Sequence, residues 1–323
     1  MKKVSVVLLN WNGAHFTIPC IESLRQSSYP NVEIVVVDNG STDGSPERIS
    51  ERFPDIPMIR NGANLGFAQG NNIGVDYSLR AGADYVLTLN NDTLVDPEMI
   101  SELVATTSRH EDSVAVCPKI YWFHQPDRLW FGGSRANLWF GIFDHIGMNE
   151  VDNSRYATER DIGFATGCCI LVPRKIIEAV GMFDPAFFIY CEDVDWSLRC
   201  RRAGFRLLFA PKAKLRHVES GMTRQLTAWK RYLFTRNAIW TVRRNGTALH
   251  KAVYFFLMYP LLALRRIMRF GLRRQWDGLR AEVRGARDGF FTRLQSAEQL
   301  AANGANCVAD AIPAHGANLF TTH

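Results

Sequence analysis

Short, mostly apolar runs alternate with amphipathic stretches through the first third of the chain. The apolar runs are Val4–Leu9, Glu33–Val37, Met58–Arg60 and Tyr85–Leu89. The helical stretches include one that begins at Ser45-Pro46 and runs to about Phe53, and another over Gln69–Arg80. Strands that alternate with helices are typical of a parallel sheet with crossover helices. We therefore expect an α/β fold with a mostly parallel sheet.

Polar clusters directly follow three of these strands. They are Asn10-Trp11-Asn12, the run from Asp38 to Asp43, and Asn90-Asn91-Asp92. In open α/β sheets, ligands bind outside the carboxyl ends of the strands. These clusters are therefore the first places to look for chemistry.

The rest of the chain changes character twice. Residues 114–222 combine short β-like runs with one helix, namely Val114–Cys117, Cys169–Val172, Arg206–Phe209 and the helix Asp195–Ala203. From Gln225 the chain is helical, basic and aromatic. Residues 295–323 are rich in Ala, Asn and Gly without periodicity, which favours a disordered tail. The sequence therefore divides into residues 1–222, 223–294 and 295–323.

The charge follows this division. Residues 1–222 carry 22 Lys and Arg against 27 Asp and Glu, a balance of −5, whereas residues 223–294 carry 16 against 3, a balance of +13. An amphipathic stretch of aromatics and arginines suits an anionic membrane surface at the inner leaflet. The alternative is a helical bundle with a solvated basic face. Nucleic acid is disfavoured as a partner because no helix-turn-helix, RRM, KH or zinc-finger pattern is present.

Several classes of protein are disfavoured by what the sequence lacks. The longest uncharged apolar run, Ala252–Leu264, is shorter than the roughly 20 residues of a spanning helix. Seven cysteines without a C-x-x-C motif favour a reduced, cytoplasmic compartment. A P-loop, a G-x-S-x-G nucleophile and the zinc spacings of Cys and His are absent, so a P-loop phosphate site, a serine hydrolase and a zinc site are unsupported.

Asp92 ends the polar cluster after the strand Tyr85–Leu89. A carboxylate beside two amides suits Mg²⁺ or Mn²⁺ shared with a diphosphate, because Mg²⁺ takes one or two protein carboxylates together with phosphate oxygens. The alternative is that this sequence turns the chain and caps the helix near Pro97. His217 stands alone, and a lone histidine is more often structural than a metal ligand.

Three acids, Glu192, Asp193 and Asp195, follow the apolar, aromatic stretch Phe183–Tyr190. An acid beside an apolar wall has a raised pKa and can act as a general base. The alternative is that Asp193 or Asp195 caps the next helix and pairs with its arginines. We expect one acid to cap and another to be catalytic.

Taken in order, these strings resemble the family 2 glycosyltransferases of GT-A fold. The matching strings are Val6–Gly13, Val37–Ser45, Asn64–Phe67 with Asn71-Asn72, Leu89–Asp92, Phe183-Asp184 with Phe187, Tyr190–Asp195, and His217. The resemblance covers residues 3–222, and within the family it is greatest to bacterial rhamnosyltransferases that use dTDP-L-rhamnose to build cell-envelope polysaccharide. It implies that residues 1–222 form a catalytic domain with a Rossmann-like, mostly parallel sheet.

The resemblance implies which residues bind the nucleotide. Asp38 resembles the acid that contacts the base or ribose, with the turn Asn10-Trp11-Asn12 beside it. Asn64, Gly66 and Asn71 fall where the family wraps the nucleotide.

It also implies a metal and a base. Asn90-Asn91-Asp92 occupies the place of the D-x-D motif, so Asp92 would reach a Mg²⁺ or Mn²⁺ ion held by the diphosphate, and His217 would complete its shell. Asn90 stands where many relatives have Asp, and an amide adds no charge. Asp193, in the pair Glu192-Asp193, matches the general base. Arg236-Asn237 resembles a C-terminal motif to which the resemblance gives no role.

The implied reaction is a single inverting displacement on a nucleotide-sugar donor. The family's usual acceptor is a saccharide linked to a polyprenyl diphosphate, which fits a cytoplasmic enzyme at the inner face of the cell membrane. Two alternatives stay open: the same fold with a UDP-hexose donor, and a noncatalytic subunit that binds a sugar nucleotide.

Overall fold

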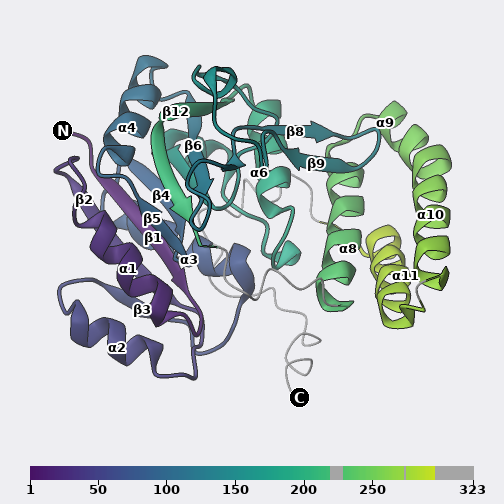
Figure 1. The fold of residues 1–323 in the computed structure, drawn as a ribbon, viewed down its shortest axis with the longest axis horizontal. Helices are drawn as coiled ribbons and strands as arrows, with labels where there is room; N and C mark the ends of the chain where they lie inside the picture. The colour runs from purple at the N-terminus through teal and green to yellow at the C-terminus, as the bar shows by residue number, and fades with distance from the viewer. Residues whose placement is uncertain (219–227, 273, 295–323) are drawn as a thin grey trace.

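A computed structural model describes residues 1–218, 228–272 and 274–294 of the chain (Figure 1). The predicted disordered tail, residues 295–323, lies outside the described residues. A large mixed sheet occupies one part of the molecule, and the helices of the C-terminal part lie on one side of it (Figure 1). The division of the chain after residue 222 stays a prediction.

Ten strands of the described residues form this sheet. Their order is β10-β12-β6-β11-β4-β1-β2-β3, with β5 also paired to β12 and β7 to β6. The strands are β1 (Val4–Asn10), β2 (Val32–Asp38), β3 (Met58–Arg60), β4 (Tyr85–Asn90), β5 (Thr93–Val95), β6 (Val114–Trp122), β7 (Leu129–Phe131), β10 (Arg160–Asp161), β11 (Cys169–Pro173) and β12 (Arg206–His217).

The four strands expected in the first third are confirmed, and they are mutually parallel. β1 pairs in parallel with both β2 and β4, and β2 pairs in parallel with β3. Val4, Val6, Val7 and Leu8 of β1 are fully buried, as in a strand covered on both faces. β11 is antiparallel to β4 and β6, so the sheet is mixed beyond this point. Asn10, Asp38 and Asn90 therefore end parallel strands at the same edge of the sheet.

Helices cover the sheet. They are α1 (Ala14–Leu24), α2 (Ser45–Arg52), α3 (Gly66–Arg80), α4 (Met99–Arg109), α5 (Arg174–Val180) and α6 (Glu192–Arg202). α3 lies close to β1, because a Cβ built at Gly74 would lie 2.3 Å from Cγ1 of Val7. α6 begins at Glu192, three residues before the predicted start, after Cys191 has adopted the left-handed conformation at φ 65°.

The C-terminal part contains α8 (Ala228–Asn245), α9 (Ala248–Val253), the π-helical turn η3 (Tyr254–Met258), α10 (Tyr259–Leu272) and α11 (Trp276–Phe291). α8 contacts α6 on the sheet side and α11 on the other. A separate hairpin of β8 (Ser134–Asn137) and β9 (Ile142–His145) extends toward α9 (Figure 1). Short 3-10 turns η1 (Ser154–Tyr156) and η2 (Pro185–Phe187) complete the elements. Among the described helices, none is long and apolar enough to span a bilayer.

Candidate active site

The loops after β1 and β2 are joined through Asp38. Asn10 Nδ2 donates to Asp38 Oδ1 at 2.9 Å, and the backbone N–H of Ser41 donates to Asp38 Oδ2 at 3.0 Å. Asp38 is 3% exposed, so these bonds hold its carboxylate within the loops. Asn12, at φ 50°, accepts from the backbone N–H of Thr42 at 2.8 Å, and Trp11 lies beside it in the same turn. The predicted nucleotide-binding residues of β1 and β2 are therefore adjacent.

Asn39 connects these loops to the start of α3. Its Nδ2 donates to Asn64 Oδ1 at 3.0 Å and to the carbonyl oxygen of Gly66 at 3.2 Å. Its Oδ1 accepts from the Leu65 backbone N–H and from Asn61 Nδ2, both at 3.1 Å. No role was predicted for Asn39 from the sequence, although its place directly after Asp38 marks it. We call residues 10–13, 38–45 and 61–66 the strand-end loops.

Asn71 and Asn91 lie differently with respect to these loops. Asn71 is 1% exposed, and its Nδ2 donates to the carbonyl oxygen of Phe67 in its own helix at 2.9 Å, so this bond does not reach the strand-end loops. Asn91 Nδ2 donates to Thr17 Oγ1 at 2.8 Å, and Thr17 Oγ1 donates to Asn10 Oδ1 at 2.8 Å. Asn91 is therefore coupled to the β1 end. The nucleotide-wrapping role of Asn71 and the donor-binding role of Asn91, in the place of the D-x-D motif, stay predictions.

Asp92 and His217 meet although they are far apart in sequence. His217 Nε2 lies 3.1 Å from Asp92 Oδ1, because β5 follows Asp92 directly and pairs with the end of β12. Both side chains are buried, and His217 packs edge-on against Trp130 at 4.7 Å between ring centroids. The described residues contain no cluster of three or more His, Cys, Asp or Glu side chains suited to a metal. A cation here would therefore have two protein ligands of this kind.

Gly167 and Cys168 connect the base candidate to the end of β4. The backbone N–H of Gly167 donates to Asp193 Oδ2 at 2.8 Å, and the carbonyl oxygen of the next residue, Cys168, accepts from the backbone N–H of Asn90 at 2.8 Å. Asn90 and Asp193 are thereby held by two consecutive residues of one loop. Gly167 was not identified from the sequence, because glycines are common before strands whether or not a site is nearby.

The acids of α6 have different environments. Asp193 is partly exposed, and burial raises its pKa to about 6 against the lowering effect of bonds from the backbone N–H groups of Gly167 and Val194. Glu192 is 4% exposed, and burial together with the neighbouring charge of Asp193 holds its pKa well above the usual range. Among the residues that the structure describes, Glu192 Oε2 has no hydrogen-bond partner. Asp193 is therefore the acid that is ionised near neutral pH and reachable.

Asp195 is the structural acid of the three. It is fully buried and pairs with Arg199 at 3.0 Å and with Arg244 of α8 at 2.9 Å. Arg244 also pairs with Asp184 at 2.6 Å. The expected pairing with an arginine of the same helix is confirmed, but Cys191 is the N-cap residue and no acid side chain caps the helix. We call residues 184–195 the acid segment.

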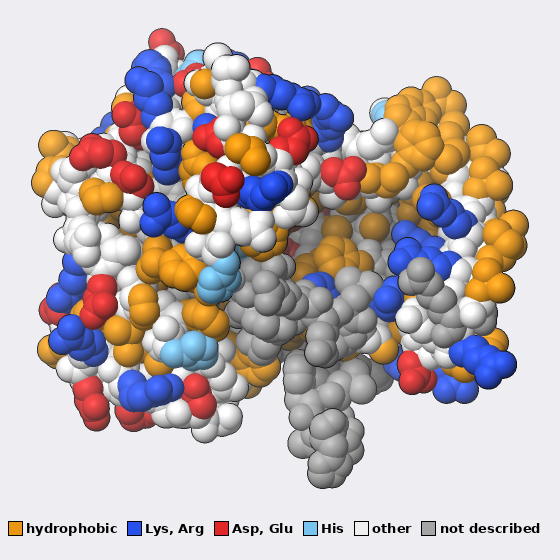
Figure 2. Space-filling view, in the orientation of Figure 1, with side chains coloured by type: hydrophobic (Ala, Val, Ile, Leu, Met, Phe, Trp, Pro, Cys, Tyr) orange, Lys and Arg blue, Asp and Glu red, His pale blue; other side chains and the backbone are white. Residues whose placement is uncertain are grey.

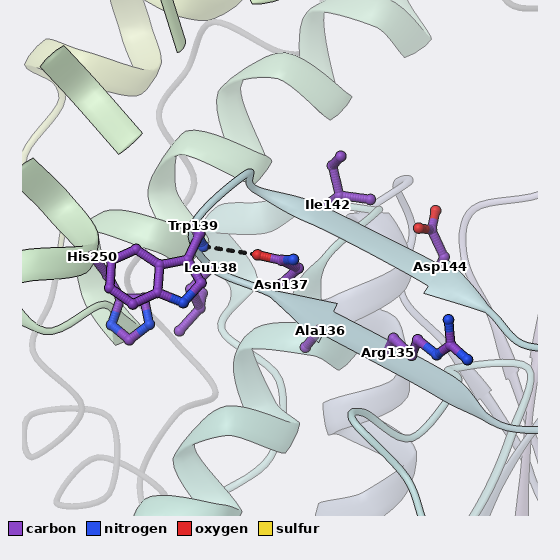
Figure 3. A pocket seen from close by; sticks show the side chains of 8 residues that line it. All are labelled: Arg135, Ala136, Asn137, Leu138, Trp139, Ile142, Asp144 and His250. Carbon is purple, nitrogen blue, oxygen red and sulfur yellow. Dashed lines mark hydrogen bonds between the residues drawn. The ribbon is translucent and has the colours of Figure 1, made fainter. Parts of the chain in front are cut away.

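A cavity of about 530 Å³ lies between the β8–β9 hairpin and α9, apart from these groups (Figure 3). Its polar lining includes Arg135, Asn137, Asp144 and His250, and Trp139 lies against His250 with ring centroids 4.1 Å apart (Figure 3). None of the site residues identified from the sequence lines it.

The sequence profile of glycosyl transferase family 2 matches residues 5–181, so the chain belongs to this family. The protein is therefore an enzyme of the glycosyltransferase class, and the predicted family is confirmed.

Relatives and a solved structure agree with this class. The N-acetylglucosaminyl-diphospho-decaprenol L-rhamnosyltransferase of Mycobacterium tuberculosis is 29% identical over 230 residues, which cover 63% of this chain and 72% of that protein. The dTDP-rhamnosyl transferase RfbF of Shigella flexneri is 24% identical over 249 residues, or 72% and 79% of the two chains. The structure of GalNAc-T7 with UDP, GalNAc and Mn²⁺ matches with a TM-score of 0.63 at 18% identity, over 79% of this chain and 50% of that one. The expected GT-A fold is thereby confirmed.

Proposed function

We propose that the enzyme transfers L-rhamnose from dTDP-L-rhamnose, with inversion, to a saccharide linked to a polyprenyl diphosphate. One observation carries this proposal: Asp193 and the β4 end that leads to Asp92 are held by two consecutive residues of one loop, Gly167 through its N–H and Cys168 through its carbonyl oxygen. A base and a diphosphate-binding group are thus close together. The names of the two relatives support rhamnose as the sugar, and the mycobacterial name supports the lipid-linked acceptor.

In this mechanism Asp193 is the general base. The acceptor hydroxyl oxygen forms a bond to the anomeric carbon as the bond from that carbon to the diphosphate breaks, and the hydroxyl proton goes to the Asp193 carboxylate. dTDP leaves with the electron pair of the broken bond. The backbone N–H groups of Gly167 and Val194 donate to the Asp193 carboxylate and keep it oriented in its ionised form. Burial holds the pKa of the neighbouring Glu192 well above its usual range, which favours the negative charge on Asp193.

Asp92 and His217 fit a divalent cation. A carboxylate and an imidazole are a donor pair that Mn²⁺ accepts, and Mg²⁺ is served by the carboxylate with phosphate oxygens. His217 Nε2 lies 3.1 Å from Asp92 Oδ1, so the two donor atoms are close enough to bind one cation together. When bound, the cation offsets the charge that develops on the departing diphosphate.

The test is a transfer assay with two donors. The purified protein is incubated with N-acetylglucosaminyl-diphospho-decaprenol as the acceptor probe and with either dTDP-L-rhamnose or UDP-glucose, in Mn²⁺ or Mg²⁺. We expect a rhamnosylated lipid product from dTDP-L-rhamnose and none from UDP-glucose. A product from UDP-glucose alone would overturn the assignment of the sugar. Binding of dTDP without turnover of either donor would favour a noncatalytic role.

We further propose that α10 rests on an anionic membrane surface. Large apolar side chains are exposed along η3 and α10, namely Phe256, Leu257, Leu261, Leu264, Ile267, Met268 and Leu272, which we call the α10 face. Phe256 is 87% exposed and Leu272 is 86% exposed. Figure 2 shows apolar side chains gathered over α9 and α10 at the right edge of the molecule. Soluble proteins rarely expose so many neighbouring apolar side chains unless they bind a partner.

The charge beside the α10 face favours lipid over a second copy of the chain. The sequence from Ser220 to Trp276 contains no Asp or Glu, and Arg265 and Arg269 are exposed next to the apolar positions. Each arginine near an anionic bilayer contributes about 1 kcal/mol of attraction. A symmetric dimer through this face would bring the same arginines together, which is unfavourable. The complementary surface is therefore one of anionic headgroups.

Vesicle flotation tests this proposal. We expect the protein to float at low salt with vesicles of phosphatidylcholine and phosphatidylglycerol, and Leu264→Glu to reduce the bound fraction about tenfold. Val151→Glu is the matched control, because Val151 is 47% exposed and lies outside the C-terminal helices. Wild-type protein that stays at the bottom of the gradient would overturn the proposal. A concentration-dependent doubling of mass that Leu264→Glu abolishes would assign the face to a second copy instead.

A further inference from the structure

The backbone just before Asp193 has a rare conformation. Phe188, at φ 65° and ψ −63°, is the centre of a γ-turn in which the backbone N–H of Ile189 donates to the Phe187 carbonyl oxygen at 2.8 Å. Tyr190 and Cys191 follow in the left-handed region at φ 73° and 65°. Residues other than glycine are strained at positive φ, and this type of γ-turn is uncommon. Such a segment persists only when its surroundings hold it.

Asn237 of α8 holds this segment from one side. Its Nδ2 lies 3.0 Å from the carbonyl oxygen of Phe187, 2.9 Å from that of Ile189 and 2.7 Å from that of Tyr190. Asn237 is fully buried. One side-chain amide, with two N–H groups, is thus within hydrogen-bonding distance of three carbonyl oxygens. The positive φ angles direct these carbonyl groups toward Asn237.

Arg236 fixes the direction in which the Asn237 amide points. Arg236 Nε donates to Asn237 Oδ1 at 2.8 Å, so the amide nitrogen must face the segment. Arg236 Nη2 adds a bond to the Phe187 carbonyl oxygen at 3.0 Å. The guanidinium lies over the Trp240 ring at 4.2 Å, which holds it in place. The motif Arg236-Asn237 is therefore a single hydrogen-bonding unit directed at this segment.

The other side of the segment contacts the strand-end loops. The backbone N–H of Ala68 donates to the Phe188 carbonyl oxygen at 3.1 Å. A Cβ built at Gly66 would lie 2.6 Å from the Phe188 ring, so only glycine fits at that position. Phe188 thus lies between the predicted nucleotide-wrapping loop and the unit Arg236-Asn237.

We propose that Asn237, oriented by Arg236, is the positioning residue for Asp193: it holds residues 187–191 in their strained form and so sets where the base lies relative to the nucleotide loops. The inference rests on the proposed role of Asp193. Asn237 acts through the backbone, because its side chain bonds to main-chain carbonyl groups and to Arg236.

The experiment compares Asn237→Ala and Asn237→Asp with Thr241→Val. Thr241 is a matched control, because it is fully buried one turn further along α8 and its hydroxyl donates to the Asn237 carbonyl oxygen of the same helix, at 2.9 Å. Asn237→Asp keeps the shape and removes both N–H donors. Each protein is examined by hydrogen exchange of the peptide that covers residues 186–195, by binding of dTDP with Mn²⁺, and by rhamnosyl transfer to N-acetylglucosaminyl-diphospho-decaprenol.

We expect faster exchange of this peptide in both Asn237 variants, with dTDP affinity within about threefold of wild type. The kcat should fall on the order of 100-fold with little change in the KM for donor, since a small misplacement of a catalytic group has an effect of this size. Thr241→Val should change none of these values. Unchanged exchange, unchanged kcat, or equal losses of kcat and dTDP binding would overturn the positioning role. If the Asn237 variants exchange faster but Asp193→Asn keeps full activity, Asn237 holds residues 187–191 as proposed, and Asp193 is not the base.

Discussion

The strand-end loops and the acid segment lie at the same edge of the sheet but are held in different ways. In the strand-end loops, Asp38 and Asn39 bond to neighbours from the same set of loops. In the acid segment, the backbone is held by Asn237, which lies 47 residues after Tyr190. The first region satisfies these polar groups within its own set of loops, whereas the second keeps a partly exposed base and a buried acid in place through a distant helix. Donor binding and base placement are therefore separately built and can be separated by mutation.

The largest effect is expected for a substitution of Asp193, which should change the transfer rate without changing donor binding. Asp193→Asn should lower the transfer rate by at least about 1,000-fold and leave dTDP binding unchanged. The free energy of unfolding of the variant at pH 8 should not fall by more than a lost hydrogen bond explains, because the raised pKa of Asp193 means that ionising it in the folded protein is itself unfavourable. Rates and dTDP affinity are measured on the same preparation. Appreciable turnover by the variant would move the base to another group.

Arg244→Met should destabilise the acid segment. Asp184 then loses its buried cation, while Asp195 retains Arg199. Removing one partner of a buried ion pair costs about 3–5 kcal/mol of unfolding free energy. Arg80→Met is the control, because the pair of Arg80 with Asp76 is exposed and contributes about 0.5 kcal/mol or less. Urea unfolding measures the free energy of unfolding of both variants. Equal losses in the two variants would show that the ion pairs of Arg244 do not stabilise the acid segment.

Asn39→Ala should destabilise the strand-end loops and leave the acid segment unchanged. The part-buried N–H of Leu65 and the buried carbonyl group of Gly66 lose their partner, which lowers the free energy of unfolding by about 1–3 kcal/mol. We expect weaker dTDP binding, measured by calorimetry, with unchanged exchange of the peptide over residues 186–195. Faster exchange in that peptide would show that the two regions are coupled more tightly than we propose.

His217→Ala gives the smallest effect of these four substitutions. Loss of one of the two proposed protein ligands should weaken Mn²⁺ binding in the presence of dTDP about tenfold, by analogy with other changes in metal shells. Binding of dTDP without metal should not change. A Mn²⁺ affinity equal to that of wild type would make His217 a structural partner of Asp92 only.

Local patterns predicted much of the first region. The strands ending at Asn10, Asp38 and Asn90 follow from apolar runs, and each polar cluster lies directly after one of them. The residue pattern alone could not show that Asp92 meets His217, because the contact depends on pairing of β5 with β12. The family resemblance suggested that the two residues act together, and the structure supplies their distance.

The second region was predicted only in part. The three acids were identified, but their separate environments depend on Gly167 and Arg244, which lie on other elements. The strained backbone at Phe188 has no sequence signal, since aromatic residues rarely occupy positive φ. Arg236-Asn237 was noticed as a motif without a role, because its hydrogen-bond partners are main-chain groups and any residue supplies those.

The pH dependence of kcat tests most directly whether Asp193, with a pKa raised to about 6, is the base. Only the ionised carboxylate accepts a proton, so kcat at saturating donor should be flat above this pH and fall about tenfold per unit below it. Histidines titrate in the same range, so the profile is repeated in His217→Asn. We expect a midpoint near pH 6 in both proteins. A midpoint near 4, or one that disappears in His217→Asn, would contradict it.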